Sequence, residues 1–220
     1  MPSLEELGEK IRSALDEKNL AREEALSLSR EIIRTSANTI RAGHRGELAR
    51  AREMLGSAAG AVGRLRARLN ASTANADLLG AGYVHDCQKE YAEAAVFLAL
   101  IEGGEIPDPD GLRVEYPAYL NGMGEAVGEL RRHTLDTMRR GELERAEALL
   151  AAMDEIYYLL VTFDYPDALT GGLRRTTDSV RGIIEKTRGE LTTALRQDEL
   201  RGAIEAALDR LQQGSRPHVG

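Results

Sequence analysis

The feature that most constrains this chain is a pair of glutamates on a helix face that otherwise carries apolar residues. Residues three and four apart share one face of a helix, so Glu90, Glu93 and Phe97 project from the same side, together with Leu100. This side should face the protein interior, where an unpaired charge costs far more than an ordinary contact returns. No cation stands on that face, because Lys89 is offset by about 100°. The fold must therefore bring a partner to these carboxylates.

Composition predicts an all-α protein. The 220 residues include no Trp and only 4% aromatic residues, and the sequence is dense in Ala, Leu, Glu and Arg, which favour helices. We expect a bundle of six to eight helices in one domain over residues 1–213, followed by a flexible tail over residues 214–220. A single cysteine, no signal-peptide pattern and no membrane-spanning run predict a cytoplasmic protein with no membrane partner.

Helix signals occur along the whole chain. Ser3 and Glu6 form a capping-box pattern that predicts a helix from the start, and Asn19 is a candidate N-cap for a second helix. Gly and Pro clusters separate the later segments. The ranges expected to be helical are about 3–18, 20–42, 47–69, 83–102, 118–140, 142–163, 173–196 and 198–212.

Arginines are repeated along the second of these helices. Arg30, Arg34, Arg41, Arg45 and Arg52 are spaced so that they fall within about 60° of one another if the helix is continuous. A ridge of arginines suits a phosphate backbone, because the planar guanidinium group binds phosphate through two donors. The alternative is a solvated face paired with neighbouring glutamates, and the net charge of −7 argues against indiscriminate binding to polyanions.

A second acidic pair, Glu125 and Glu129, lies on the helix expected after Pro117. Both residues lie beside the apolar stripe of that helix, which by itself is typical of a solvent-exposed edge. Gly122 and Gly128 in the same helix are a second signal, because glycine within a helix costs about 1 kcal/mol relative to Ala and often marks the close approach of another backbone or a ligand.

Taken together, the two acidic pairs predict a metal site. Two facing helices would each offer two carboxylates, which suit hard divalent ions such as Mg²⁺ or Mn²⁺. Zinc is disfavoured because His85 and Cys87 lack metal-ligand spacing, and a di-iron site would need Glu-x-x-His pairs that the sequence lacks. No nucleophile elbow, phosphate-binding loop or dinucleotide motif is present.

Three segments resemble the translin superfamily, and in particular its catalytic branch, translin-associated factor X. The first contains Cys87-Gln88-Lys89-Glu90-Tyr91-Ala92-Glu93-Ala94. The second runs over 119–132 and contains Gly128-Glu129-Leu130, and the third runs over 173–195 and contains Glu185-Lys186-Thr187-Arg188-Gly189-Glu190. The resemblance covers about residues 26–195 and rests on the order and spacing of these segments.

This resemblance implies an all-α fold of about seven helices, a homo-oligomer in the form of a hollow octamer, and Mg²⁺-dependent endoribonuclease activity on single-stranded RNA, with single-stranded DNA as a further possible ligand. The catalytic, metal-binding acids of the branch fall on Glu90, Glu93, Glu125 and Glu129. The third is commonly Asp in that branch, and the longer Glu125 keeps the charge but could shift the metal. The nucleic-acid-binding arginines of relatives fall loosely on Arg30, Arg34, Arg41 and Arg45.

Two other functions fit the same residues. The first is a translin-type protein that binds single-stranded RNA or DNA without cleaving it, in which the acids only stabilise the bundle or its oligomer. The second is an all-α nucleotide pyrophosphohydrolase, in which paired acidic helices hold Mg²⁺ around a triphosphate. The usual second pair of that class is Glu-x-x-Asp, whereas Glu125 and Glu129 form Glu-x-x-x-Glu.

Overall fold

Helices make up almost the entire part of the chain that the structure describes, residues 2–214 of a computed structural model. No strand occurs within this range, which confirms the predicted all-α class. The elements are α1 (Leu4–His44), α2 (Leu48–Asn70), the 3₁₀ turn η1 (Thr73–Asn75), α3 (Ala76–Leu79), α4 (Gly82–Glu102), α5 (Pro109–Leu112), α6 (Tyr116–Arg139), α7 (Leu143–Leu160), α8 (Asp167–Thr170) and α9 (Leu173–Gly214).

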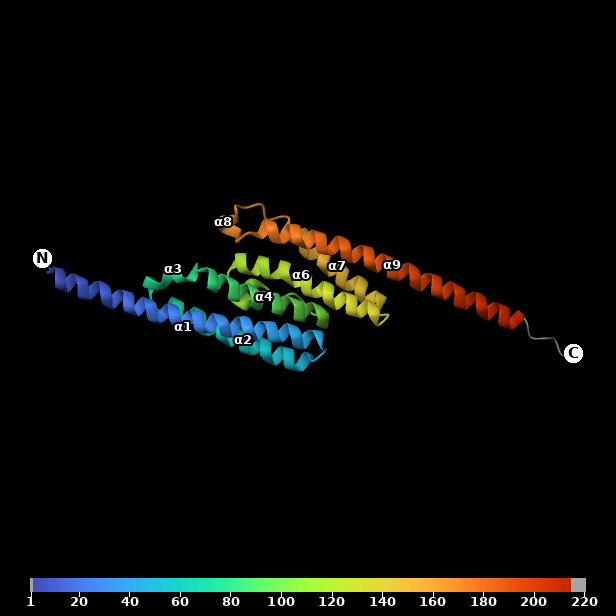
Figure 1. The fold of residues 1–220 in the computed structure, drawn as a ribbon, viewed down its shortest axis with the longest axis horizontal. Helices are drawn as coiled ribbons and strands as arrows, with labels where there is room; N and C mark the ends of the chain where they lie inside the picture. Colours follow the sequence, from blue (N-terminus) through green and yellow to red (C-terminus); the bar gives the residue numbers. More distant parts are fainter. Residues whose placement is uncertain (1, 215–220) are drawn as a thin grey trace.

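The six long helices lie side by side in an elongated bundle (Figure 1). α1 packs against α2 on one side and α4 on the other, and α4 packs against α6. α6 also contacts α7 and α9, which pack against each other and close the opposite side. α4 and α6 therefore lie in the middle of the bundle, and they are the helices that carry the two acidic pairs.

Two helices are much longer than the sequence analysis expected. α1 begins with the predicted capping box, in which the Ser3 hydroxyl accepts from the Glu6 backbone N–H and the Glu6 carboxylate accepts from the Ser3 N–H at 2.7 Å. It then runs for 41 residues, so the predicted helix start at Asn19 is wrong. The break expected near residue 197 is also wrong, because α9 is continuous there. No Pro or Gly stands at either predicted break, and Asn or Asp inside a helix is only mildly unfavourable.

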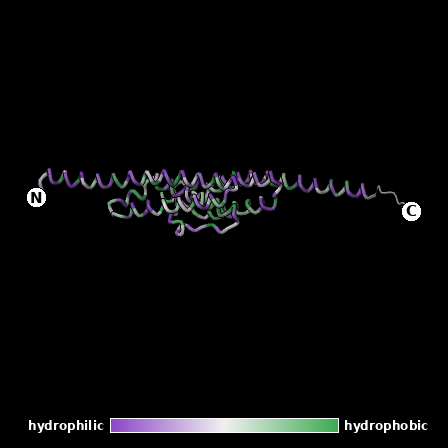
Figure 2. Tube along the Cα trace, turned by 90° about the horizontal axis from the view of Figure 1, so that it is seen from below, coloured by the Kyte–Doolittle hydropathy of each residue, from purple (hydrophilic) through white to green (hydrophobic). Residues whose placement is uncertain are grey.

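Both long helices extend beyond the bundle as single rods, at opposite ends of the molecule (Figure 2). The apolar residues on these rods are exposed: Leu4, Leu7, Ile11 and Leu15 on α1, and Leu200, Ile204, Leu208 and Leu211 on α9. Over its first turns, the predicted apolar stripe of the first helix therefore has no partner among residues 2–214. The tail expected over residues 214–220 lies, apart from Gly214, outside the described residues.

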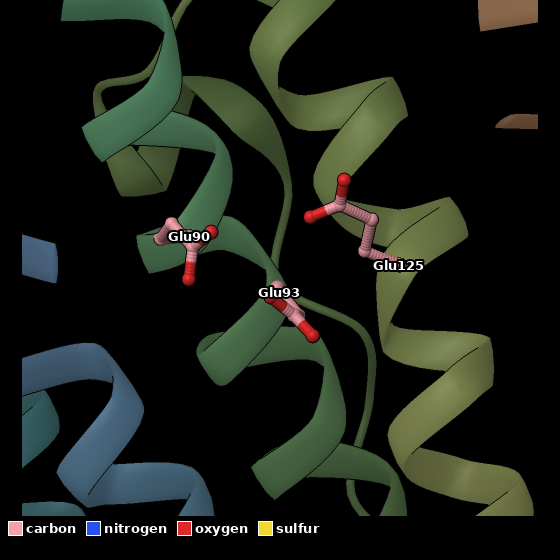
Figure 3. A group of neighbouring side chains, drawn as sticks. All are labelled: Glu90, Glu93 and Glu125. Carbon is pink, nitrogen blue, oxygen red and sulfur yellow. The ribbon is translucent and has the colours of Figure 1, made fainter. Parts of the chain in front are cut away.

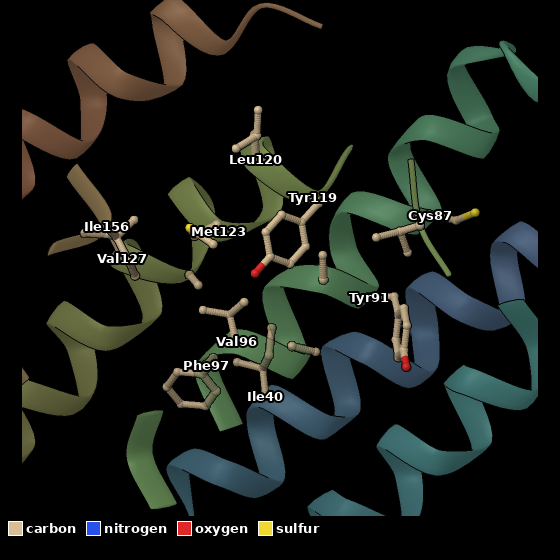
Figure 4. Close-up of a cluster of buried hydrophobic side chains, with 14 of the residues drawn as sticks. Ile40, Cys87, Tyr91, Val96, Phe97, Tyr119, Leu120, Met123, Val127 and Ile156 are labelled. Carbon is tan, nitrogen blue, oxygen red and sulfur yellow. The ribbon is translucent and has the colours of Figure 1, made fainter. Parts of the chain in front are cut away.

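The core runs between α1, α2, α4, α6, α7 and α9, and Figure 4 shows a part of it with labelled side chains from α1, α4, α6 and α7. Phe97 of α4 is fully buried and lies close to Ile40 of α1. α4 and α6 approach each other closely at Gly122, where an added Cβ would lie 2.4 Å from the Lys89 carbonyl oxygen and 2.9 Å from the Ala92 Cβ. The close approach predicted at Gly122 is therefore present, whereas a Cβ at Gly128 would meet nothing within 4 Å.

None of the helices between residues 2 and 214 combines the length and the apolar content that a bilayer span requires.

Candidate metal centre

Three of the four predicted acids lie together between α4 and α6. Glu90 and Glu93 project from successive turns of α4 toward Glu125 of α6 (Figure 3). One carboxylate oxygen from each side chain lies within 4.8 Å of the other two. These acids line an open cavity of about 570 Å³ whose other wall is formed by α9, including Arg175, Thr176 and Ser179. The cavity gives a ligand access to the acids from one side.

Glu93 is the most buried of the three acids. Its exposed fraction is 8%, no group among residues 2–214 donates a hydrogen bond to its carboxylate, and its oxygens open onto the cavity rather than being sealed from solvent. Burial raises its pKa to about 8, and repulsion from Glu90, Glu125 and Glu129 adds to the effect. Burial also raises the pKa of Glu90, although the charge of Lys89 opposes that shift. Ionisation of both α4 glutamates is therefore disfavoured, because the protein compensates their negative charge poorly.

Lys89 reaches the cluster, contrary to the sequence analysis, which expected it to point elsewhere. Its Nζ lies 2.6 Å from Oε1 and 2.5 Å from Oε2 of Glu125, and 3.7 Å from Oε1 of Glu90. Burial lowers the pKa of Lys89, but hydrogen bonding and attraction to Glu125 and the charges of Glu90 and Glu93 outweigh it and raise that pKa overall. The expectation failed because it considered only the α4 face, whereas the partner lies on α6 within reach of a long side chain.

Glu129 lies outside the group of three. Its Oε2 is 2.5 Å from Nε2 of His44, at the end of α1, and this hydrogen bond lowers the pKa of Glu129. The His44 side chain is 5% exposed, and its ring lies 4.7 Å from the ring of Phe97. His44 is separated from Glu129 by 85 positions, so no local sequence pattern indicated the contact.

A divalent cation fits the donor set of Glu90, Glu93 and Glu125. The three carboxylates are hard oxygen ligands on two helices, and Glu93 is almost fully buried without a hydrogen-bond partner. Within residues 2–214 no other group of three or more His, Cys, Asp or Glu side chains converges in this way. His85 and Cys87 do not join it, and burial raises the pKa of the Cys87 thiol to about 11, which suits a packing residue.

The predicted arginine ridge lies on one continuous helix face. Arg30, Arg34 and Arg41 are exposed on α1 and form no ion pair within the described residues, and Arg45 follows directly and binds Glu47 at 2.6 Å. Arg52 is not part of the ridge, because it lies on α2 and pairs with Glu102. None of these arginines lines the acidic cavity, and the arginine that does so is Arg175.

Comparison with known proteins places this architecture in a family. No protein-family model matches the chain. The chain is 31% identical to an uncharacterised protein of Methanocaldococcus jannaschii, MJ0175, over 188 residues, which are 85% of this chain and 82% of that protein. Among solved structures it is 33% identical to AfC3PO, over 86% of this chain and 96% of that chain, with a TM-score of 0.76 for the AfC3PO complex with duplex RNA. The chain belongs to the translin superfamily.

Two further structures agree with the translin assignment. A crystal structure of AfC3PO gives a TM-score of 0.77 at the same identity, with 97% of that chain covered. Apo-NeC3PO is 21% identical over 88% of this chain and 98% of that chain, with a TM-score of 0.71, and this likeness concerns the fold alone. The translin fold thus holds over most of the chain.

Within this translin fold, three side chains at the acids were missed as site residues by the sequence analysis: Lys89, His44 and Arg175. Lys89 and Arg175 lie within the segments that resemble translin. The sequence therefore indicated these segments, but not that the two side chains point toward the acids. His44 stands outside them. All three are brought to the acids by packing between helices.

Proposed function

We propose that this translin-superfamily protein is an endoribonuclease that depends on Mg²⁺ or Mn²⁺, as in the catalytic branch of the superfamily. The observation that carries the proposal is the convergence of Glu90, Glu93 and Glu125, with Glu93 buried and without a hydrogen-bond partner. An uncompensated group of this kind is costly in a protein that only needs to be stable, and is typical of a ligand site. RNA as the substrate is supported by the AfC3PO complex with duplex RNA.

The residues of the site suggest how the roles are divided. Glu90, Glu93 and Glu125 would hold the cation, which when bound lowers the pKa of a water molecule and neutralises charge on the scissile phosphate. Glu129 is the candidate acceptor of the proton from the attacking water, held in position by His44. Arg175 lines the cavity beside the acids, forms no ion pair within residues 2–214, and is placed to bind a phosphate oxygen.

The arginines of α1 would contribute affinity rather than chemistry. Arg30, Arg34, Arg41 and Arg45 lie outside the acidic cavity, on an exposed face. Contacts from such a face to a sugar-phosphate backbone would be sensitive to salt and largely independent of sequence. We further propose a homo-oligomer, because the exposed apolar residues on the free ends of α1 and α9 have no partner within the described chain.

The test is a cleavage assay on a short RNA, offered as a single strand and as a duplex, with Mg²⁺ or Mn²⁺. Cleavage should stop in EDTA and should leave 5′-phosphate ends. Glu90→Gln and Glu93→Gln should each lower the rate at least about 100-fold while RNA binding survives, because each variant removes a charged ligand but keeps the shape. Glu105→Gln is the matched control, since Glu105 is exposed and distant from the cluster.

A second candidate function is RNA binding without cleavage. The pairing of Lys89 with Glu125 favours it, because the lysine already compensates part of the negative charge without a metal ion. Equal cleavage rates for the wild type and both glutamine variants would support this function and would assign the activity to a contaminant. Release of pyrophosphate from nucleoside triphosphates in the same samples would instead indicate a pyrophosphohydrolase.

A further inference from the structure

Lys89 occupies a position in the site that a cation ligand would also require. Its ammonium group contacts both oxygens of Glu125, at 2.6 and 2.5 Å, and its distance to Oε1 of Glu90 is 3.7 Å. The same two glutamates provide two of the three oxygens that converge in the metal-binding group. The lysine side chain is only 18% exposed, so the contact lies inside the site rather than on its rim.

The backbone of Lys89 is held in place by the packing of α4 against α6. The Lys89 carbonyl oxygen faces α6 at a point of close approach, where a Cβ at Gly122 would come within 2.4 Å of it. The backbone at this position therefore has little freedom to move, and only the long side chain can change its direction. The backbone of Lys89 thus stays beside Glu125, while its ammonium group can leave the Glu125 carboxylate by a change of side-chain conformation.

The positive charge of Lys89 opposes the binding of a divalent cation at the same carboxylates. An ammonium group and a divalent cation at the same carboxylates repel each other, and the repulsion is strong because the surroundings are half buried and shield it less than bulk water. The cation would also need at least one Glu125 oxygen to which Lys89 now donates. Binding of the cation and retention of the lysine contact are thus opposed.

We propose that Lys89 is a built-in competitor of the divalent cation, which holds Glu125 in the metal-free protein and sets a cation concentration below which the site stays inactive. This inference rests on the proposed nuclease function. It differs from a purely structural role, in which Lys89 orients Glu125 for the metal. A structural role predicts that loss of the lysine weakens cation binding, and competition predicts that the loss strengthens it.

The first experiment measures Mn²⁺ binding to the full chain without RNA, by the electron paramagnetic resonance signal of free Mn²⁺. Lys89→Met and Lys89→Gln should bind Mn²⁺ at least about tenfold more tightly than the wild type, and Lys89→Arg, which keeps the charge, within about threefold of it. Lys10→Met is the matched control, because it removes one positive charge from the exposed end of α1, and its affinity should not change. Equal or weaker binding by both neutral Lys89 variants would overturn the proposal.

The second measurement needs no substitution. The chain has only four lysines, Lys10, Lys18, Lys89 and Lys186, so the reductive methylation of each can be followed separately by mass spectrometry. Adding Mg²⁺ should increase the methylation rate of Lys89 several-fold, because the amine is released from Glu125, and should leave Lys10 unchanged. An unchanged rate at Lys89 at a Mg²⁺ concentration that saturates the protein would contradict the proposal.

Failure of the inference and failure of the proposed function give different results. If Mn²⁺ binds equally to wild type and Lys89→Met while RNA is cleaved, the competition is refuted and the nuclease remains. If Lys89→Met binds Mn²⁺ more tightly but neither protein cleaves RNA, the competition is supported and the nuclease function is refuted.

Discussion

The two acidic pairs of the site differ in what the protein supplies to balance their charge. On α6, Glu125 receives two hydrogen bonds from Lys89, and Glu129 is bound by His44 at 2.5 Å. On α4, Glu93 has no hydrogen-bond partner within the described chain, and the cation nearest to Glu90 is Lys89, at 3.7 Å. The pKa values follow this difference, since burial raises those of Glu90 and Glu93 and the His44 hydrogen bond lowers that of Glu129.

Two glutamate pairs on adjacent helices therefore lie in different electrostatic environments. The α6 pair is balanced by protein groups and can persist as it is. The α4 pair lowers the stability of the folded protein whenever it is ionised, unless a cation from outside the chain compensates it.

The largest effect should come from Glu93 in metal-free protein. Its pKa of about 8 lies above the ordinary value of 4.5, so the protonated form stabilises the fold. That stability is fully present below pH 4.5 and is lost as the pH rises through about 8, a change of about 3–5 kcal/mol. Glu93→Gln mimics the protonated form, so the variant should be more stable than the wild type by this amount at pH 9.

Urea unfolding in EDTA at pH 5 and pH 9 measures this effect, and Glu105→Gln serves as the exposed control. Excess Mn²⁺ should reduce the difference between wild type and Glu93→Gln at pH 9, because the cation replaces the missing partner. A wild type as stable as the variant at pH 9 in EDTA would show that the α4 pair is compensated after all.

The next effect should come from the close contact between the helices that carry the pairs. A methyl group at Gly122 would collide with the Lys89 carbonyl oxygen at 2.4 Å, so Gly122→Ala should push α4 and α6 apart and cost about 2–4 kcal/mol of unfolding free energy. Gly128→Ala is the matched control on the same helix, where the Cβ meets nothing, and it should stabilise by up to about 1 kcal/mol. Thermal unfolding compares the two variants.

Gly122→Ala should also weaken Mn²⁺ binding, because it separates Glu125 from the α4 pair, while Gly128→Ala should not. Similar melting temperatures for both alanine variants would mean that the two helices can separate at little cost, and would remove the packing argument for a preformed site.

A smaller effect of opposite sign should come from Glu129. Its pKa is lowered by the His44 hydrogen bond, so the stability it adds is present above pH 4.5 and is lost as the pH falls through the lowered pKa. Because its side chain is 31% exposed, solvent screening limits this to about 1 kcal/mol. Glu129→Gln should therefore destabilise the protein at pH 7 and lose this difference once the pH has fallen below the lowered pKa. Equal stability of both proteins at pH 7 would argue that the contact contributes nothing.

The smallest effect should come from the arginines of the α1 ridge. Those without an ion pair should contribute more to RNA affinity than the one that is paired. Arg30, Arg34 and Arg41 form no ion pair within residues 2–214, whereas Arg45 binds Glu47. Each of the first three alanine variants should lower RNA affinity about two- to fivefold and reduce the salt dependence by about one ion, and Arg45→Ala should do less. Fluorescence anisotropy with labelled RNA at several salt concentrations tests this order. A dominant loss in Arg45→Ala would reverse the argument.

Local sequence patterns were sufficient to predict the all-α fold class and the acids that stand on each of the two helices. Helix periodicity is local, so it was sufficient to place Glu90 and Glu93 on the inward side of α4, to begin α1 at its capping box, and to identify Gly122 as a point of close approach. It also aligned Arg30 to Arg45 on one face. It overestimated the number of helix breaks, because Asn19 and Asp198 lie in segments whose favourable helix propensities outweigh a single weak residue.

The contacts of each carboxylate depend on how the helices pack against one another. Lys89 turns to Glu125 because α6 lies close to α4, and His44 reaches Glu129 because α1 ends beside α6, 85 positions away. Neither contact is encoded by spacing along one helix, since both depend on how helices pack. Thus the sequence placed four acids on two helices, and packing placed three of them together and assigned the fourth to a histidine.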